Sequence, residues 1–156
     1  MSVPPSWLRN RLLLALPSSN LRRLVPELEP IPCERNQILL DADNAIESVF
    51  FPHSGVVSVL SVYEDGSVIE TATIGREDCT AFQAILGAKE SSVRFLVQIP
   101  GTASRMSRAA FMRAMKSIPG FRNLCMNMRK PSLSRCWCRG RATAPTASRN
   151  GWRVGC

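Results

Sequence analysis

The order of apolar and polar positions predicts short helices at the start of a domain whose middle is built from strands. Near the start, Trp7–Leu16 carries an apolar run suited to a short buried helix that ends at Pro17. Ser18 and Ser19 offer N-caps for a second helix, which Pro26 should end or kink. The chain therefore opens with two short helices.

After these helices the pattern becomes strand-like, with brief β-branched or aromatic runs separated by Pro, Gly, Asp and Asn. The clearest turn is Glu64-Asp65-Gly66, because its Asp-Gly pair tolerates positive φ and the flanking residues alternate as in a hairpin. Many short strands with close turns predict a sandwich or a barrel-like roll. The predicted strands are Gln37–Leu40, Ser48–Phe51, Val56–Val62, Val68–Thr73, Val93–Ile99 and Thr102–Met106.

Two further helical segments are predicted within and after the strands. Thr80–Leu86 fits one or two helical turns that end at Gly87. Ser107 is placed to cap a helix over Arg108–Lys116, whose apolar stripe is typical of a core face rather than of a ligand site.

Charge divides the chain into two unequal parts. Residues 1–120 carry twelve basic and twelve acidic side chains, whereas residues 121–156 carry eight basic side chains and no carboxylate. The formal net charge of +8 therefore comes entirely from the C-terminal segment. A composition break this abrupt marks a boundary, so we expect one domain over residues 1–125 and a basic tail over 126–156.

The remaining composition argues against several classes of protein. Six irregularly spaced cysteines without a secretory signal favour reduced thiols over a disulfide framework. Cys136 and Cys138 have no matching second pair and the single histidine is distant, so no metal site is expected. We find no combination of nucleophile, base and metal ligands that predicts catalysis. The chain also lacks an apolar run of about 18 residues, so we expect a cytoplasmic protein without a membrane contact.

Several short phrases resemble the Crp/Fnr family of bacterial transcription regulators, in their order as well as in their residues. They cover roughly residues 8 to 125 and stand in a chain of helices, strands, a short internal helix and a closing helix. The phrases are N-R-L-L-L-A-L-P at Asn10–Pro17, V-F-F-P-H-S-G-V-V-S at Val49–Ser58, I-G-R-E-D at Ile74–Asp78 and V-Q-I-P-G at Val97–Gly101.

The resemblance implies a mainly β, cyclic-nucleotide-binding-like β-roll, a double-stranded β-helix or jelly roll with flanking helices. In the family this roll senses a small effector, a long helix dimerises the protein, and a C-terminal helix-turn-helix binds DNA. Nucleotide-binding members hold the cyclic phosphate with helix N–H groups, a Gly-Glu pair and an Arg followed by Ser/Thr-Ala. Here Ser91-Ser92-Val93 stands where Arg-Ser/Thr-Ala belongs, and Cys79-Thr80 lies near the Gly-Glu pair.

Both charged anchors of this phosphate cassette are therefore missing, and tight binding of cyclic AMP is not expected. The effector stays open. We predict a ligand pocket around five residues, with the alternative that the two charged ones are solvated surface groups and the two serines ordinary strand residues. These residues are Arg76, Glu77, Thr80, Ser91 and Ser92.

Other sensing chemistry of the family also lacks support in the sequence. An iron–sulfur sensor needs a cysteine cluster near the N-terminus, and only Cys33 lies in the first 78 residues. A haem sensor needs an axial ligand, and His53 in the turn-like F-P-H-S-G is interpreted as an exposed loop histidine.

The basic tail permits two hypotheses. Codons compatible with residues 128–156, read in another frame, can spell a segment that resembles the family's dimerisation helix, so the first hypothesis is a frameshift near Cys125 that removes the DNA-binding domain. The alternative is non-specific nucleic-acid binding, with the eight cations of residues 121–156 to neutralise phosphates and Trp137 and Trp152 to stack on bases. Without the usual docking helix, an uncovered apolar face is expected to favour self-association, including a homodimer.

Overall fold

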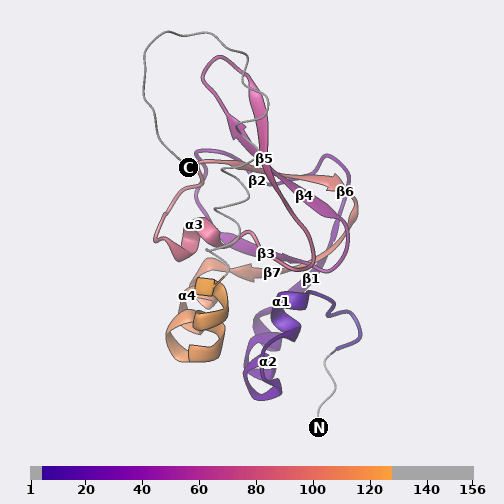
Figure 1. Ribbon diagram of the computed structural model, residues 1–156, viewed down its shortest axis with the longest axis vertical. Helices are drawn as coiled ribbons and strands as arrows, with labels where there is room; N and C mark the ends of the chain where they lie inside the picture. Colours follow the sequence, from indigo (N-terminus) through magenta and orange to yellow (C-terminus); the bar gives the residue numbers. More distant parts are fainter. Residues whose placement is uncertain (1–4, 128–156) are drawn as a thin grey trace, which may run out of the picture.

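The structure is a computed structural model that describes residues 5–127. It consists of two antiparallel sheets, with the N-terminal and C-terminal helices at one end and one short helix beside the sheets (Figure 1). One sheet has the order β1-β7-β3 and the other has the order β2-β6-β4-β5. The two sheets together form the predicted roll. The strands are β1 Glu29–Cys33, β2 Ile38–Leu40, β3 Ser48–Pro52, β4 Val56–Val62, β5 Val68–Ile74, β6 Arg94–Ile99 and β7 Gly101–Ser107.

The helices are shorter at the start of the chain than the apolar pattern predicts. The first comprises only Arg11–Leu14, because the side chain of Asn10 accepts a hydrogen bond from the N–H group of Leu13 and starts the helix there. The second begins at Ser18, with Pro17 at the N-cap position, so the predicted serine cap is wrong. The described helices are α1 Arg11–Leu14, α2 Ser18–Leu24, a 3-10 turn at Val25–Glu27, α3 Phe82–Ile85, α4 Arg108–Ser117 and a helical segment over residues 119–127.

The local signals at the other helices and turns are confirmed. Ser107 caps α4, since its hydroxyl accepts a hydrogen bond from the Ala110 N–H group at 3.2 Å. Gly87 follows α3 with φ 87°, and Gly66 closes the β4–β5 hairpin with φ 82°. Figure 1 shows this hairpin projecting from the end of the molecule opposite the helices.

Strand β1 is the one strand absent from the predicted set. Its sequence Glu29–Cys33 contains two prolines, which argue against a strand because they remove ladder donors. In the structure β1 is the end strand of its sheet and pairs only with β7, so one of its edges requires no ladder bonds. The pairing with β7, and not the residues of β1 themselves, therefore makes this segment a strand.

Apolar side chains of the described residues form one large cluster between the helices and the β1-β7-β3 sheet, and two smaller ones inside the roll. In the large cluster, the ring of Phe121 contacts Phe51 at a tilt and Phe111 edge-on. None of the helices within residues 5–127 has the length and apolar character needed to span a bilayer. Of the predicted basic tail over 126–156, all but the first two residues lie outside the described part of the chain.

Candidate functional site

The candidate site is the cassette segment, residues 75–93, which joins β5 to β6 and carries the short helix α3. Its last part runs beside the loop over residues 41–47 that joins β2 to β3. The Ser91 carbonyl accepts from the Asp43 N–H group at 2.7 Å, and the Ser91 N–H group donates to the Asn44 carbonyl at 2.9 Å. Ile46 adds a bond to the Lys89 carbonyl at 2.8 Å. The cassette segment and this loop therefore form one backbone unit.

Gln83 of α3 brings together the two predicted serines of the pocket. Its side-chain oxygen accepts a hydrogen bond from the Ser91 hydroxyl at 2.7 Å, and its amide nitrogen donates to the Ser92 hydroxyl at 2.6 Å. Gln83 and Ser91 are buried, whereas Ser92 is exposed. Sequence reasoning missed Gln83, although a lone amide on an otherwise apolar short helix was the available signal. Gln83 therefore joins α3 to the end of the cassette segment through two side-chain hydrogen bonds.

Replacing Gln83 by leucine is expected to lower the free energy of unfolding by about 1–3 kcal/mol, because it leaves the buried Ser91 hydroxyl with one fewer partner and removes the bond to Ser92. Urea unfolding of the two proteins measures the difference. The same substitution at Gln98, an exposed position of β6, is the matched control and should change stability by less than about 0.5 kcal/mol. Equal effects at the two positions would contradict the network.

The other three predicted pocket residues lie at the start of the cassette segment. Thr80 is buried and bonded to β3 in both directions, since its hydroxyl accepts from the Phe50 N–H group at 3.0 Å and its own N–H group donates to the Phe50 carbonyl at 3.0 Å. These contacts give Thr80 a structural part in joining the segment to the sheet. Arg76 and Glu77 have exposed side chains, and the Arg76 carbonyl accepts a bond from the N–H group of Arg11.

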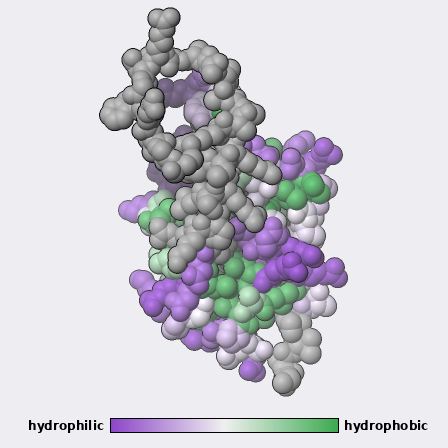
Figure 2. All heavy atoms as spheres, in the orientation of Figure 1, coloured by the Kyte–Doolittle hydropathy of each residue, from purple (hydrophilic) through white to green (hydrophobic). Residues whose placement is uncertain are grey.

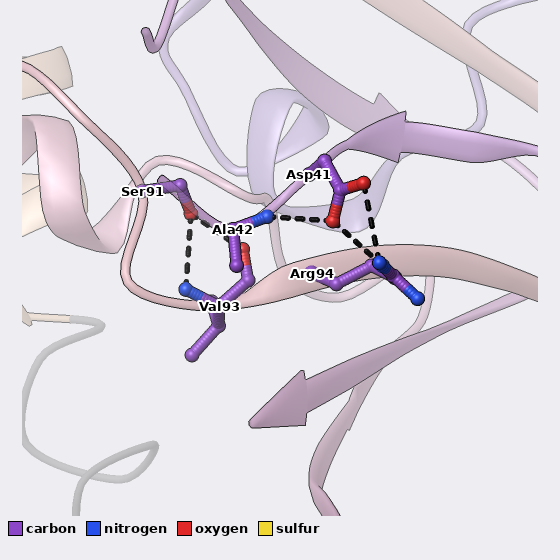
Figure 3. A network of polar contacts seen from close by, with 5 residues as sticks. All are labelled: Asp41, Ala42, Ser91, Val93 and Arg94. Atoms are coloured by element: carbon purple, nitrogen blue, oxygen red, sulfur yellow. Dashed lines mark hydrogen bonds and ion pairs between the residues drawn. The ribbon is translucent and has the colours of Figure 1, made fainter. Parts of the chain in front are cut away.

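A charged pair closes the end of the cassette segment, as Figure 3 shows. The guanidinium of Arg94 contacts the two carboxylate oxygens of Asp41 at 2.6 and 3.2 Å, and the Ala42 N–H group also donates to Asp41. The hydrogen bond from Arg94 lowers the pKa of the Asp41 carboxyl, and the same bond raises the pKa of Arg94. The charge of Arg94, which follows the two serines in the chain, is thus already neutralised by Asp41.

Hydrophobic side chains fill the interior of the roll beneath α3. Phe95 is fully buried, and the ring of Phe82 packs against it edge-on with 5.9 Å between ring centroids. Val57, Val59 and Ile74 complete the buried part of this cluster. Phe82 comes from the cassette segment itself, so the segment supplies the apolar group that occupies the space below it.

The interpretation of His53 as an exposed loop residue is wrong, because the structure buries it. Its Nδ1 accepts hydrogen bonds from the backbone N–H groups of Arg9 and Asn10 at 3.2 and 3.1 Å, and its Nε2 lies 2.7 Å from the Ser104 hydroxyl. Trp7 contacts the ring edge-on. The partners come from residues distant in sequence, so no local pattern could reveal them. Both ring nitrogens are occupied by protein groups, and neither faces an open ligand position.

The described cysteines are protonated, buried thiols. Cys33, Cys79 and Cys125 are free, and burial raises the pKa of each, for Cys125 to about 12. Within residues 5–127 no group of three or more His, Cys, Asp and Glu side chains is arranged to hold a metal ion. The structure therefore offers hydrogen-bonding and apolar groups at this site, and no reactive thiolate.

Comparison with known proteins gives the site its context. The family model described as "Cyclic nucleotide-binding domain" matches residues 30–117, which is more than half of the chain and includes the whole cassette segment. Curated proteins gave no match.

Many solved structures share the fold at low sequence identity. The c-di-GMP responsive global regulator CLP of Xanthomonas campestris superposes with a TM-score of 0.70 at 8% identity, over 80% of this chain and 63% of that one. The sensor domain of the transcriptional regulator DNR from Pseudomonas aeruginosa has a TM-score of 0.62 at 12% identity, over 88% and 90%. The chain thus spans less than two thirds of the first regulator and most of the second sensor domain.

A third structure is the regulatory subunit of a cAMP-independent protein kinase A from Trypanosoma brucei. It has a TM-score of 0.69 at 15% identity, over 86% of this chain and 49% of that one. A mutant of that subunit with three substitutions is described as bound to cAMP. At these identities the likeness concerns the fold.

Proposed function

Since the chain belongs to the cyclic nucleotide-binding domain family, we propose that it is the ligand-sensing domain of a Crp/Fnr-type transcription regulator, with a phosphate cassette that no longer takes a cyclic nucleotide. Its task is effector binding and not catalysis. The observation that carries this proposal is the Gln83 amide bound to Ser91 and Ser92, at the positions where the resemblance expects a phosphate-binding arginine and its neighbour.

The chemistry of the segment supports the loss of nucleotide binding. A buried cyclic phosphate needs a charge-assisted contact, and Arg94, which follows the two serines in the chain, is paired with Asp41. Losing one such contact costs on the order of 1.5–3 kcal/mol. The ring of Phe82, which belongs to the cassette segment, packs edge-on against Phe95 in the apolar cluster of the roll. A domain of this fold in a cAMP-independent protein, as in the trypanosomal subunit, is consistent with such a change.

Thermal unfolding with added cyclic AMP, cyclic GMP and cyclic di-GMP tests the proposal, because a ligand that binds the folded state raises its apparent stability. We expect no saturable rise with any of the three. The cAMP-bound mutant of the trypanosomal subunit is the positive control for the assay. A saturable rise with the present chain would show that its cassette still binds nucleotide.

The output of the sensor is the second part of the proposal. We propose that the segment after residue 125 replaces the family's dimerisation helix and DNA-binding domain through a frameshift. Figure 2 shows hydrophobic side chains gathered over the helical end of the molecule, and Leu14 and Met126 are among the exposed large apolar residues. Such a surface favours a homodimer. Genomic DNA tests the frameshift directly, and codons that do not spell a helix-turn-helix regulator in the shifted frame would refute it.

The alternative function is non-specific nucleic-acid binding through the eight basic residues of the C-terminal segment. Electrostatic binding to phosphates falls steeply with salt. DNA binding that weakens with salt and disappears when residues 126–156 are deleted would favour this alternative over the sensor without output.

A further inference from the structure

Two adjoining hollows on the roll have no residue of the cassette segment in their lining. The larger, of about 630 Å³, is bordered by β2, the 41–47 loop and β3, and the smaller, of about 460 Å³, continues toward the 3-10 turn before β1. Glu47, Ser48 and Arg105 line both of them. We call the two hollows together the β2–β3 groove. Its size is in the range of small-molecule sites in proteins.

The groove exists because the two sheets end on this side of the roll. Strand β2 is the end strand of one sheet and β3 is the end strand of the other. Their side chains give the groove an apolar wall, with Leu40 and the exposed Ile38 on β2 and Phe50 on β3. The register of β3 with β7 places Arg105 directly opposite Phe50, so the cation stands beside this wall.

One cation, Arg105, and four carboxylates line the groove. Of the carboxylates, Glu27, Glu29 and Asp41 are each paired with an arginine of the chain, which leaves Glu47 for a ligand. Both the Nε and the Nη2 atoms of Arg105 contact a single oxygen of Glu29, at 3.0 and 2.6 Å, which leaves further donors of the guanidinium unused. The side chains of Arg105 and Glu29 are 48% and 60% exposed, so a surface pair of this kind contributes little free energy. A ligand carboxylate can therefore replace Glu29 as the partner of Arg105. Glu47 is exposed, and its carboxylate makes no hydrogen bond or ion pair within residues 5–127.

The groove is also connected to the cassette segment. Asp41 and Asn44 line its larger part, and they belong to the loop whose backbone bonds Ser91. The carboxylate of Asp41 also holds Arg94 at the start of β6. A ligand in the groove therefore contacts the same loop that fixes the end of the cassette segment.

We propose that the β2–β3 groove binds a free amino acid with an apolar side chain. Arg105 takes the carboxylate, Glu47 takes the ammonium group, and the side chain packs on Ile38, Leu40 and Phe50. Neighbouring charges of opposite sign beside an apolar wall match a zwitterion better than an anion or a cation alone. This inference deepens the proposed function, because it names an effector class for a domain proposed to sense one.

Isothermal titration calorimetry of the full chain with L-phenylalanine and L-leucine tests the groove. We expect saturable binding of at least one of the two amino acids. The analogues 3-phenylpropionate, which lacks the ammonium group, and phenethylamine, which lacks the carboxylate, should bind more weakly by a factor of about ten or more. Arg105→Gln and Glu47→Gln should each weaken amino-acid binding by a similar factor. The matched controls are Arg122→Gln and Glu64→Gln, which change exposed groups outside the groove lining and should leave binding unchanged.

Absence of binding by either amino acid, or binding that neither groove variant weakens, would overturn the inference. The same titration with cyclic AMP separates the two proposals. If neither the amino acids nor cyclic AMP bind, only the amino-acid site in the groove is refuted. If cyclic AMP binds, the proposed loss of nucleotide binding by the cassette is refuted, whatever the result with the amino acids.

Discussion

Replacing Phe95 by alanine is expected to lower the free energy of unfolding by about 3–5 kcal/mol. Phe95 is fully buried in the roll, and its ring contacts Phe82 from the cassette segment. The substitution removes this contact and leaves a cavity that the surrounding strands β4 and β6 can only partly close. A domain of this size is stable by about 5–15 kcal/mol, so the loss is large. Urea unfolding monitored by circular dichroism measures it.

The matched control is Ile99→Ala at the other end of β6, where the side chain is 52% exposed. We expect a change below about 0.5 kcal/mol there. A double variant of Phe82 and Phe95 should show a coupling of about 0.5–1.5 kcal/mol, because the two rings lose one shared contact. If Phe95→Ala were as mild as Ile99→Ala, the roll interior would not be packed as described.

Acid is expected to destabilise the domain through His53. Its Nδ1 accepts two backbone hydrogen bonds, so the ring is neutral with its proton on Nε2 toward Ser104. Burial lowers the pKa of His53 from the ordinary 6.5. The unfolded chain therefore binds a proton at a pH where the folded chain does not, and the free energy of unfolding falls as the pH drops below about 6.5. Above this pH the contribution is complete.

The variant His53→Ala checks both parts of this prediction. At pH 8 it should lower the free energy of unfolding by about 2–4 kcal/mol, because two backbone N–H groups and the Ser104 hydroxyl lose their partner. The chain has a single histidine, so the variant should also lose the part of the pH dependence that begins near 6.5. Urea midpoints between pH 5 and 8 report both effects. Parallel curves for the two proteins would mean that His53 stays accessible to protons in the folded state.

His53 connects the N-terminal segment to the roll. The N–H groups of Arg9 and Asn10 donate to its ring, and the side chain of Asn10 donates to the carbonyls of Pro52 and Asp78. Releasing this histidine thus loosens the attachment of α1 to the roll. The effect of acid should be strongest in the N-terminal segment, which hydrogen exchange by residue can resolve.

Local signals in the sequence determined the elements whose cause is local. Asp65 and Gly66 define the hairpin because the turn needs positive φ, and Ser107 starts α4 because its hydroxyl satisfies an orphan N–H group. Runs of β-branched and aromatic residues predicted the strands from β2 onward. The order of the short family-like sequence motifs indicated the family. The break in charge near residue 121 likewise needs only the sequence.

Tertiary structure alone decided the features that depend on partners distant in the chain. Strand β1 exists despite Pro30 and Pro32 because β7 supplies its ladder, and His53 is buried because the backbone at residues 9 and 10 folds over it. Gln83 meets Ser91 and Ser92 only when α3 packs against the end of the cassette segment. The periodicity of the sequence predicts which side chains of a strand face the core. Which residues they contact there depends on the pairing of β3 with β7 and of β4 with β6, and no local pattern contains this pairing.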